Sequence, residues 1–226
     1  MSVQEIQFAA LQGAAEVSAV LHEPDDARVL IALAHGAGAG MRHAFMQSIA
    51  QALARNGVAT FRYQFPYMES GKGRPDAQPL LLATVRSAVE AAHAHAPDLP
   101  LFAGGKSMGG RMTSLAAAEA PLPGVHGIVF IGFPLHPAGR PGIQRAEHLA
   151  ATTAPLLFVQ GTRDTLAELE LLRPIVQELG ERARMHVIDD ADHGFAVRRR
   201  TTGRSSADVI EEIAAVSAGW FGELLG

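Results

Sequence analysis

The sequence contains the three side chains that acyl chemistry on a serine needs. Ser107 lies in "GKSMG" (residues 105–109), which matches the G-x-S-x-G pattern of a nucleophilic serine. Asp164 ends the stretch "LFVQGTRD", and His193 lies in "DADHGF". A serine hydroxyl becomes a nucleophile when a histidine removes its proton and a carboxylate orients that histidine. We therefore predict that Ser107 is the nucleophile, His193 the base and Asp164 the orienting acid.

The residues "GKS" (105–107) also match the end of a phosphate-binding P-loop. That loop needs a glycine five residues before its Gly-Lys-Ser, where this sequence has Pro100. Residues 101–103 belong to an apolar run, so a strand uses the N–H groups that phosphate would need. The glycines at 105 and 109 instead favour a sharp turn from a strand into a helix, which exposes Ser107. A serine that only capped a helix would not require them.

The stretch "AHGAGAGM" (residues 34–41) looks like a dinucleotide-binding fingerprint, but its spacing is wrong. Met41 or His43 stands where G-x-G-x-x-G requires a final glycine or alanine. Arg62, which ends the next apolar run, leaves a nucleotide-binding alternative open, because an arginine at this place can bind a 2′-phosphate.

The same loop suits an oxyanion hole better. In the chemistry predicted above, a loop after an early core strand gives one backbone N–H to the oxyanion, and the residue after the nucleophile gives the other. Ala37 and Met108 hold these two positions. We expect Gly38 to contact the substrate, and we expect the side chain of His35 to brace the loop.

Four further residues are candidates for substrate contact. Tyr63 and Phe65 lie in a Pro-rich stretch and are expected to wall a pocket, with local packing as the alternative. Lys106 and Arg111 flank Ser107 and would attract an anionic substrate, with surface charges or an ion pair as the alternative.

Other titratable residues do not suggest a second site. Asp189, Asp190 and Asp192 are rival acids, but they lie in the loop of His193 and are interpreted as solvated turn residues. His93 and His95 are two residues apart on an expected helix, so they face different ways. No metal-ligand spacing occurs, and no metal is predicted.

Six apolar runs predict strands that are covered on both faces. They are residues 29–34, 58–62, 101–105, 127–133, 155–161 and 185–189. Segments with helical spacing separate most of them, at residues 43–55, 80–95, 108–120, 166–179 and 207–224. This alternation predicts an α/β fold with a doubly wound, mostly parallel sheet and helices on both faces. Strands near 6–8 and 16–21 are expected to form an antiparallel edge.

Two irregular stretches, residues 63–79 and 134–149, are expected at the carboxyl edge of the sheet, where they would border a shallow cleft. The interval 133–155 has room only for a short helix near 145–149, so no cap domain is predicted.

Composition limits the remaining possibilities. The 226 residues predict one domain over 1–226, and the net charge of −4 argues against nucleic-acid binding. "RRR" at 198–200 is too short to change that. The sequence has no cysteine, no signal-peptide pattern and no apolar stretch of membrane-spanning length. We expect a cytoplasmic protein that does not bind membranes.

The motifs "HGAGAGM", "FRYQFPYM", "GGKSMGGRM", "FPLHPAG", "LFVQGTRD" and "DADHGF" together resemble the α/β-hydrolase superfamily, in its dienelactone-hydrolase-like branch. They look most like the group typified by testis-expressed protein thirty. The resemblance implies a Ser107–Asp164–His193 triad, a small-molecule acyl substrate and no cofactor. Some relatives serve as interaction subunits, so a non-catalytic interaction module is the alternative, and acyl transfer is another.

Overall fold

Eight strands form one sheet in the computed structural model, which describes residues 1–11 and 16–226. The strands are β1 (Ser2–Ala9), β2 (Glu16–Glu23), β3 (Val29–Ala34), β4 (Val58–Tyr63), β5 (Leu101–Lys106), β6 (Val125–Ile131), β7 (Leu156–Gly161) and β8 (Ala183–Ile188). Their order across the sheet is β1-β2-β4-β3-β5-β6-β7-β8. β2 is antiparallel to β1 and to β4, and the other neighbours are parallel. The predicted mostly parallel sheet with an antiparallel edge is confirmed.

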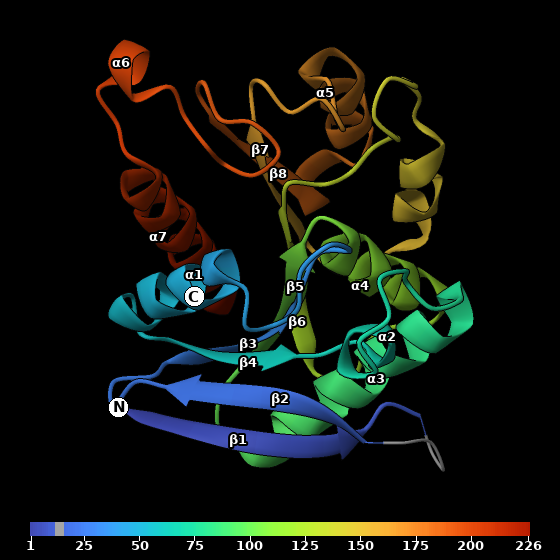
Figure 1. Cartoon of the computed structure of the whole chain (residues 1–226), viewed down its shortest axis with the longest axis vertical. Coiled ribbons are helices and arrows are strands. Elements are labelled where there is room, and N and C mark those ends of the chain that lie inside the picture. The colour runs from blue at the N-terminus through green and yellow to red at the C-terminus, as the bar shows by residue number, and fades with distance from the viewer. Residues whose placement is uncertain (12–15) are drawn as a thin grey trace.

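Helices cover both faces of this sheet. The α-helices are α1 (Ala44–Arg55), α2 (Pro66–Glu69), α3 (Gln78–His95), α4 (Met108–Glu119), α5 (Leu169–Glu178), α6 (Arg199–Thr202) and α7 (Ser206–Leu225), and the 3-10 helices are η1 (Gln144–Ala151) and η2 (Gly180–Arg182). α1 and α7 pack together on one face, and α3 and α4 pack together on the other (Figure 1). None of the described helices is both long and apolar enough to cross a membrane.

β3 shows why a central strand of this sheet is apolar throughout. All six of its residues are buried. Leu30 and Ala32 pack in the core cluster under α3 and α4, whereas Ile31 and Leu33 pack in the cluster under α1 and α7. Because successive side chains of a strand point to opposite faces, a strand covered on both faces needs apolar residues at every position.

The two irregular stretches contain short helices and no cap. Residues 63–79 include α2, and residues 134–149 lead into η1, close to the short helix expected at 145–149. Within residues 132–155, all of which are described, η1 is the only helix between β6 and β7. The carboxyl edge of the sheet is therefore left open above the loops that follow β3, β5, β7 and β8. These four loops carry Ala37, Ser107, Asp164 and His193.

Candidate active site

Ser107 occupies a strained turn between β5 and α4. Its φ is 51°, a left-handed value that is uncommon for a residue with a side chain. β3 crowds this turn from the side: a Cβ on Gly105 would lie 2.4 Å from the Ala34 carbonyl oxygen, and one on Gly109 would lie 2.6 Å from that of His35. Glycine is therefore required on both sides of Ser107, as the G-x-S-x-G pattern predicts.

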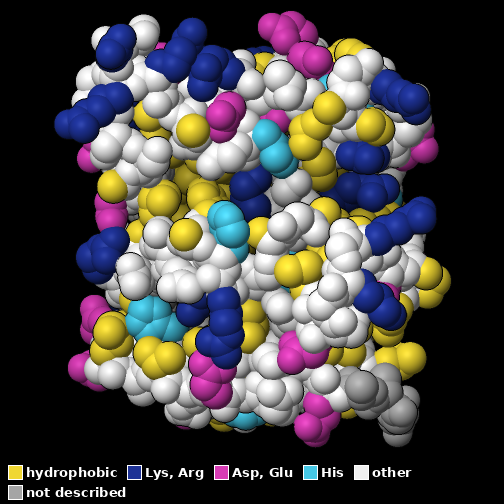
Figure 2. All heavy atoms as spheres, viewed as in Figure 1, with side chains coloured by type: hydrophobic (Ala, Val, Ile, Leu, Met, Phe, Trp, Pro, Cys, Tyr) yellow, Lys and Arg dark blue, Asp and Glu magenta, His cyan; other side chains and the backbone are white. Residues whose placement is uncertain are grey.

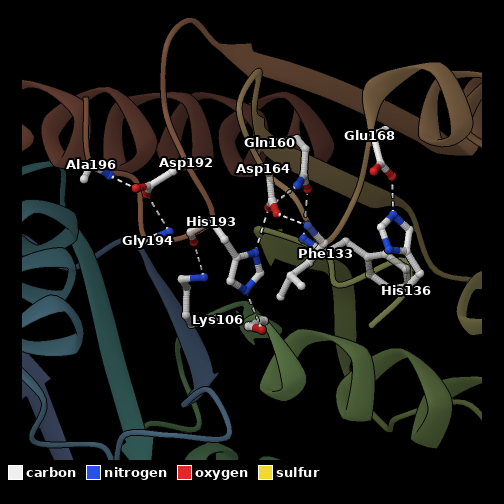
Figure 3. A network of polar contacts seen from close by, with 12 residues as sticks. Lys106, Phe133, His136, Gln160, Asp164, Glu168, Asp192, His193, Gly194 and Ala196 are labelled. Carbon is white, nitrogen blue, oxygen red and sulfur yellow. Dashed lines mark hydrogen bonds and ion pairs between the residues drawn. The ribbon is translucent and has the colours of Figure 1, made fainter. Parts of the chain in front are cut away.

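A chain of hydrogen bonds links the three predicted catalytic side chains. His193 Nε2 lies 2.8 Å from Ser107 Oγ, and His193 Nδ1 lies 2.7 Å from Asp164 Oδ2 (Figure 3). A carboxylate only accepts hydrogen bonds, so Nδ1 carries the proton and Nε2 is left to accept from the serine hydroxyl. Asp164 is buried, and His193 is half-buried. The structure thus brings together residues that are up to 86 positions apart in the sequence.

Gln160 holds the carboxylate of Asp164 in place. Its Nε2 donates to Asp164 Oδ2 at 2.5 Å, and its Oε1 accepts from the Phe133 N–H at 2.9 Å (Figure 3). The Leu166 N–H donates to the other carboxylate oxygen at 2.8 Å. Three donors, including His193, therefore fix the orientation of Asp164. Gln160 was not predicted from the sequence, although a single amide in the apolar run "LLFVQG" was a signal for it.

The loop around His193 is fixed by two side chains. Asp192 Oδ1 accepts from the N–H groups of Gly194 and Ala196 at 2.8 and 2.9 Å. Lys106 Nζ donates to the carbonyl oxygen of His193 at 2.7 Å (Figure 3). The backbone on both sides of the imidazole is therefore tied, which keeps the ring between Ser107 and the acid.

The rival acids have structural contacts of their own. Asp190 is buried rather than solvated, because it forms ion pairs with Arg163 and Arg198. Asp192 binds the loop backbone as described above. Asp189 is exposed, and Asp192 is half-buried within its own turn, so the expectation of solvated turn residues is corrected for Asp190 only.

The loop after β3 is braced from behind. His35 Nε2 accepts from the Phe65 N–H at 3.1 Å, so its Nδ1 carries the proton and donates to the Gly36 carbonyl at 2.8 Å. The Tyr67 hydroxyl donates to the Ala37 carbonyl at 2.8 Å. Burial lowers the pKa of His35 to about 4, so the ring is neutral at pH 7. His35 therefore braces the loop, as the sequence analysis expected.

This bracing determines where the Ala37 N–H points. In a trans peptide the C=O and the following N–H point in opposite directions. The Gly36 carbonyl is directed at His35, so the Ala37 N–H of the same peptide is directed away from it. Neither this N–H nor that of Met108, at the start of α4, donates a hydrogen bond within the described residues. Both are thus free to bind a ligand atom near Ser107.

A cavity of about 430 Å³ opens beside Ser107 and His193. The loop after β3 and the start of α1 form much of its wall, with Ala37, Gly38 and Phe45 among the lining residues. Gly38 therefore lies where substrate contact was expected. Among the described residues, no group of three or more His, Asp or Glu side chains is placed to hold a metal ion.

The aromatic residues that were expected to wall this cavity lie elsewhere. Tyr63 and Phe65 are buried in the core, where their rings meet at 5.5 Å between centroids and Tyr63 also packs on Phe8. Tyr63 is the last residue of β4, and Phe65 comes two residues later. Both side chains point into the interior and do not line the cavity. Residues 63–79 and 134–149 do not border the cavity either.

Arg111 and Arg62, for which the sequence suggested ligand contacts, are also outside the cavity. Arg111, one turn of α4 after Ser107, is half-buried and does not line it. Burial and the nearby Arg145 lower the pKa of Arg111. Arg62 is buried and donates to the Met41 carbonyl at 3.2 Å, so its guanidinium is not placed to bind a nucleotide phosphate.

A family model described as "Alpha/beta hydrolase domain" matches residues 26–222. A dienelactone hydrolase from Anabaena variabilis has a similar structure, with a TM-score of 0.75, 22% identity and 99% of each chain covered. An α/β serine hydrolase without lid from Xanthomonas campestris gives a TM-score of 0.72 at 20% identity, over 97% of this chain and 95% of that one. An esterase domain from Rhodothermus marinus gives a TM-score of 0.70 at 18% identity, over 97% of this chain and 98% of that one. At these identities the structural likeness shows a shared fold.

Proposed function

The chain belongs to the alpha/beta hydrolase domain family, and from that premise we propose that it is a serine hydrolase of carboxylesterase type. Its substrate would be a small ester or a similar acyl compound. One observation carries the proposal: the hydrogen-bonded series from Ser107 Oγ through His193 to Asp164, which opens onto a cavity. The sequence motifs favour the group typified by testis-expressed protein thirty as the closer affiliation.

The geometry supports a two-step mechanism. His193 Nε2 takes the proton of Ser107 as Oγ attacks the carbonyl carbon, and Asp164 stabilises the imidazolium that results. The N–H groups of Ala37 and Met108 bind the oxyanion. His193 then protonates the departing alcohol, which leaves an acyl group on Ser107. Water then attacks the acyl carbonyl carbon while His193 takes a proton from it. The bond to Ser107 Oγ breaks, His193 returns the proton to Oγ, and the carboxylic acid is released. These steps use no cofactor.

A second serine–histidine pair offers a matched control for this proposal. Ser114, also on α4, lies 2.7 Å from His148 Nε2. Ser114 is completely buried, and His148 has no carboxylate partner among the described residues. This pair therefore lacks both the access and the acid that Ser107 has, and it ties η1 to α4.

A fluorophosphonate probe and 4-nitrophenyl acetate test the proposal together. The wild-type protein and Ser114→Ala should be labelled and should hydrolyse the ester. Ser107→Ala should lose the label and about 10⁶ in turnover, if the triad behaves as a unit. A folded wild-type protein that takes no label would instead support a non-catalytic interaction module. A large rate increase with added alcohol acceptors, at the expense of free acid, would indicate acyl transfer.

A further inference from the structure

The last residue of β5 places a positive charge on the wall of the cavity beside the nucleophile. Lys106 is the only Lys or Arg among the described residues that line this cavity, and none of them is Asp or Glu. Figure 2 shows this face of the molecule, where yellow side chains border a hollow with a dark-blue side chain on its floor. The electrostatic character of the cavity is therefore set by Lys106.

The described residues accept only one hydrogen bond from the ammonium group of Lys106. It has three N–H donors. Within the described residues, one of them reaches the His193 carbonyl, and no carboxylate lies within ion-pair distance. The rings of Phe195 and Phe45 lie 5.4 and 6.0 Å from Nζ, so two neighbours of the charge are aromatic. Burial lowers the pKa of Lys106 to about 8, and the charges of Asp164 and Asp192 oppose this shift.

Lys106 is half-buried and faces the cavity, so its charge has lost part of its contact with water. A buried charge is normally paired with an opposite charge and hydrogen-bonded. A role limited to holding His193 would need one neutral donor, which an amide or hydroxyl side chain supplies without the cost of a buried charge. The remaining donors of Lys106 and the absence of a counter-charge on the described cavity wall therefore point to an anion that arrives with the ligand.

The rest of the cavity limits the size and character of that ligand. Phe45, Met46 and Leu166 give it apolar walls, and its volume of about 430 Å³ suits a compound of modest size. The ester carbonyl must lie at Ser107, the neighbour of Lys106 in the chain. The two requirements, an acyl group at the serine and an anion at the lysine, must be met by one small molecule.

We propose that Lys106 is a specificity-determining residue, and that the substrate is a small ester that also carries a carboxylate. One carboxylate oxygen accepts a hydrogen bond from Nζ while the ester carbonyl lies against Ser107. This inference rests on the proposed hydrolase function, and it adds the chemical class of the substrate.

Rates with matched charged and neutral esters test the proposal. The 4-nitrophenyl monoester of adipic acid is compared with methyl 4-nitrophenyl adipate, which has the same leaving group but no charge. A second pair, 4-acetoxybenzoate and its methyl ester, places the carboxylate on the alcohol side. We expect the wild-type protein to prefer the anion in at least one pair. Lys106→Met should reduce that preference about 10- to 100-fold, the factor that a hydrogen bond to a charged group provides.

Two further variants show whether the effect is specific. Lys106→Arg keeps a cation and should retain part of the preference. Lys72→Met removes an exposed lysine between α2 and α3 and should leave both rates unchanged. If Lys106→Met lowers the rates for charged and neutral esters equally, Lys106 only holds the His193 loop and the proposal is overturned. A wild-type protein without any preference for the anions overturns it too.

Binding to Ser107→Ala separates this inference from the proposed function. Calorimetry with monomethyl adipate and dimethyl adipate should show tighter binding of the anion, and adding Lys106→Met should remove that advantage. If the wild-type protein hydrolyses no ester but the anion still binds through Lys106, the hydrolase proposal fails and the anion site stands. If hydrolysis depends on Ser107 but neither rates nor binding favour the anion, the inference fails alone.

Discussion

Asp164 is distinguished from the other aspartates near His193 by what its carboxylate contacts. It accepts hydrogen bonds from His193, Gln160 and the Leu166 N–H, whereas Asp190 is engaged with arginines. We predict that Asp164→Asn lowers kcat by about 10⁴, the loss known when an amide replaces the acid of such a triad and imposes the wrong histidine tautomer. Hydrolysis of 4-nitrophenyl acetate by the purified variant measures this.

The exposed Asp189 provides the control for this substitution. Asp189→Asn should be close to the wild-type protein in activity. Asp192→Asn keeps an oxygen that can accept from Gly194 and Ala196, so its effect should also be small. Asp190→Asn should reduce stability rather than chemistry, because it weakens buried ion pairs. A larger loss of kcat in Asp192→Asn than in Asp164→Asn would mean that the wrong carboxylate was chosen.

At this scale the sequence predicts which candidate catalytic side chains come together better than it predicts the residues that support them. Ser107, Asp164 and His193 could be located because each follows an apolar run and they occur in the expected order. Gln160 could not, because its partners, Asp164 and the Phe133 N–H, are close to it only in the folded chain. Tyr63 was misassigned for a related reason: composition identifies an aromatic residue but not the face on which it packs.

The turn between β5 and α4 depends on how closely α4 approaches β3. Gly109 and Gly219 are both helical, and alanine favours a helix over glycine by about 1 kcal/mol. A Cβ at Gly109 would lie 2.6 to 2.7 Å from backbone atoms of Ala34, which ends β3, and of His35, which follows it, whereas one at Gly219 meets nothing within 4 Å. We predict that Gly109→Ala destabilises the protein by about 1–3 kcal/mol, as overpacking does, and that Gly219→Ala is neutral or stabilising.

Urea unfolding followed by circular dichroism measures both variants. Both substitutions raise helix propensity by the same amount, so a difference in unfolding free energy between the two variants cannot come from propensity. Equal stability of the two variants would show that β3 can move away from α4 at little cost, and that the glycine of the pentad is not needed for packing.

Whole elements were predictable where burial imposes a pattern. The runs that form β3, β4 and β7 are buried at every position, so their apolar character identifies them directly. The start of α5 was predicted three residues early, at 166 instead of Leu169. Leu166 has helical spacing in the sequence, but its N–H donates to Asp164 Oδ1. Leu166 therefore belongs to the turn after Asp164, and α5 begins later, at Leu169.

The stability of the whole molecule should depend on pH through two histidines, the buried His35 and the half-buried His148. Burial lowers the pKa of His35 to about 4, and it lowers that of His148 to about 4 with help from Arg111. These two histidines become protonated near pH 6.5 in the unfolded chain but only near pH 4 in the folded chain. Stability is therefore full above pH 6.5 and is lost as the pH falls toward 4. For the completely buried His35 alone the loss is about 3 kcal/mol over this range.

Urea unfolding at pH 7 and at pH 5 measures this effect. We expect a clear loss of unfolding free energy at pH 5, and we expect the loss to shrink by about 2 kcal/mol in His35→Gln, which cannot titrate. His93→Gln, at an exposed position on α3, is the control and should lose as much as the wild-type protein. An identical pH dependence in His35→Gln and the wild-type protein would mean that the pKa of His35 is the same in the folded and unfolded chains.

The arrangement of the whole fold also limits the acyl groups that the site can use. Residues 132–155, all described, form no cap between β6 and β7, and the cavity beside Ser107 has a volume of about 430 Å³. Each methylene that becomes buried contributes about 0.8 kcal/mol, but only until the cavity is full. We therefore predict that kcat/KM rises from acetyl to butyryl 4-nitrophenyl esters and then stops rising at octanoyl and palmitoyl. With no lid to open, the rate should not jump above the critical micelle concentration of the longer esters. A steady rise to palmitoyl, or such a jump, would require a longer tunnel or a mobile cover over Ser107.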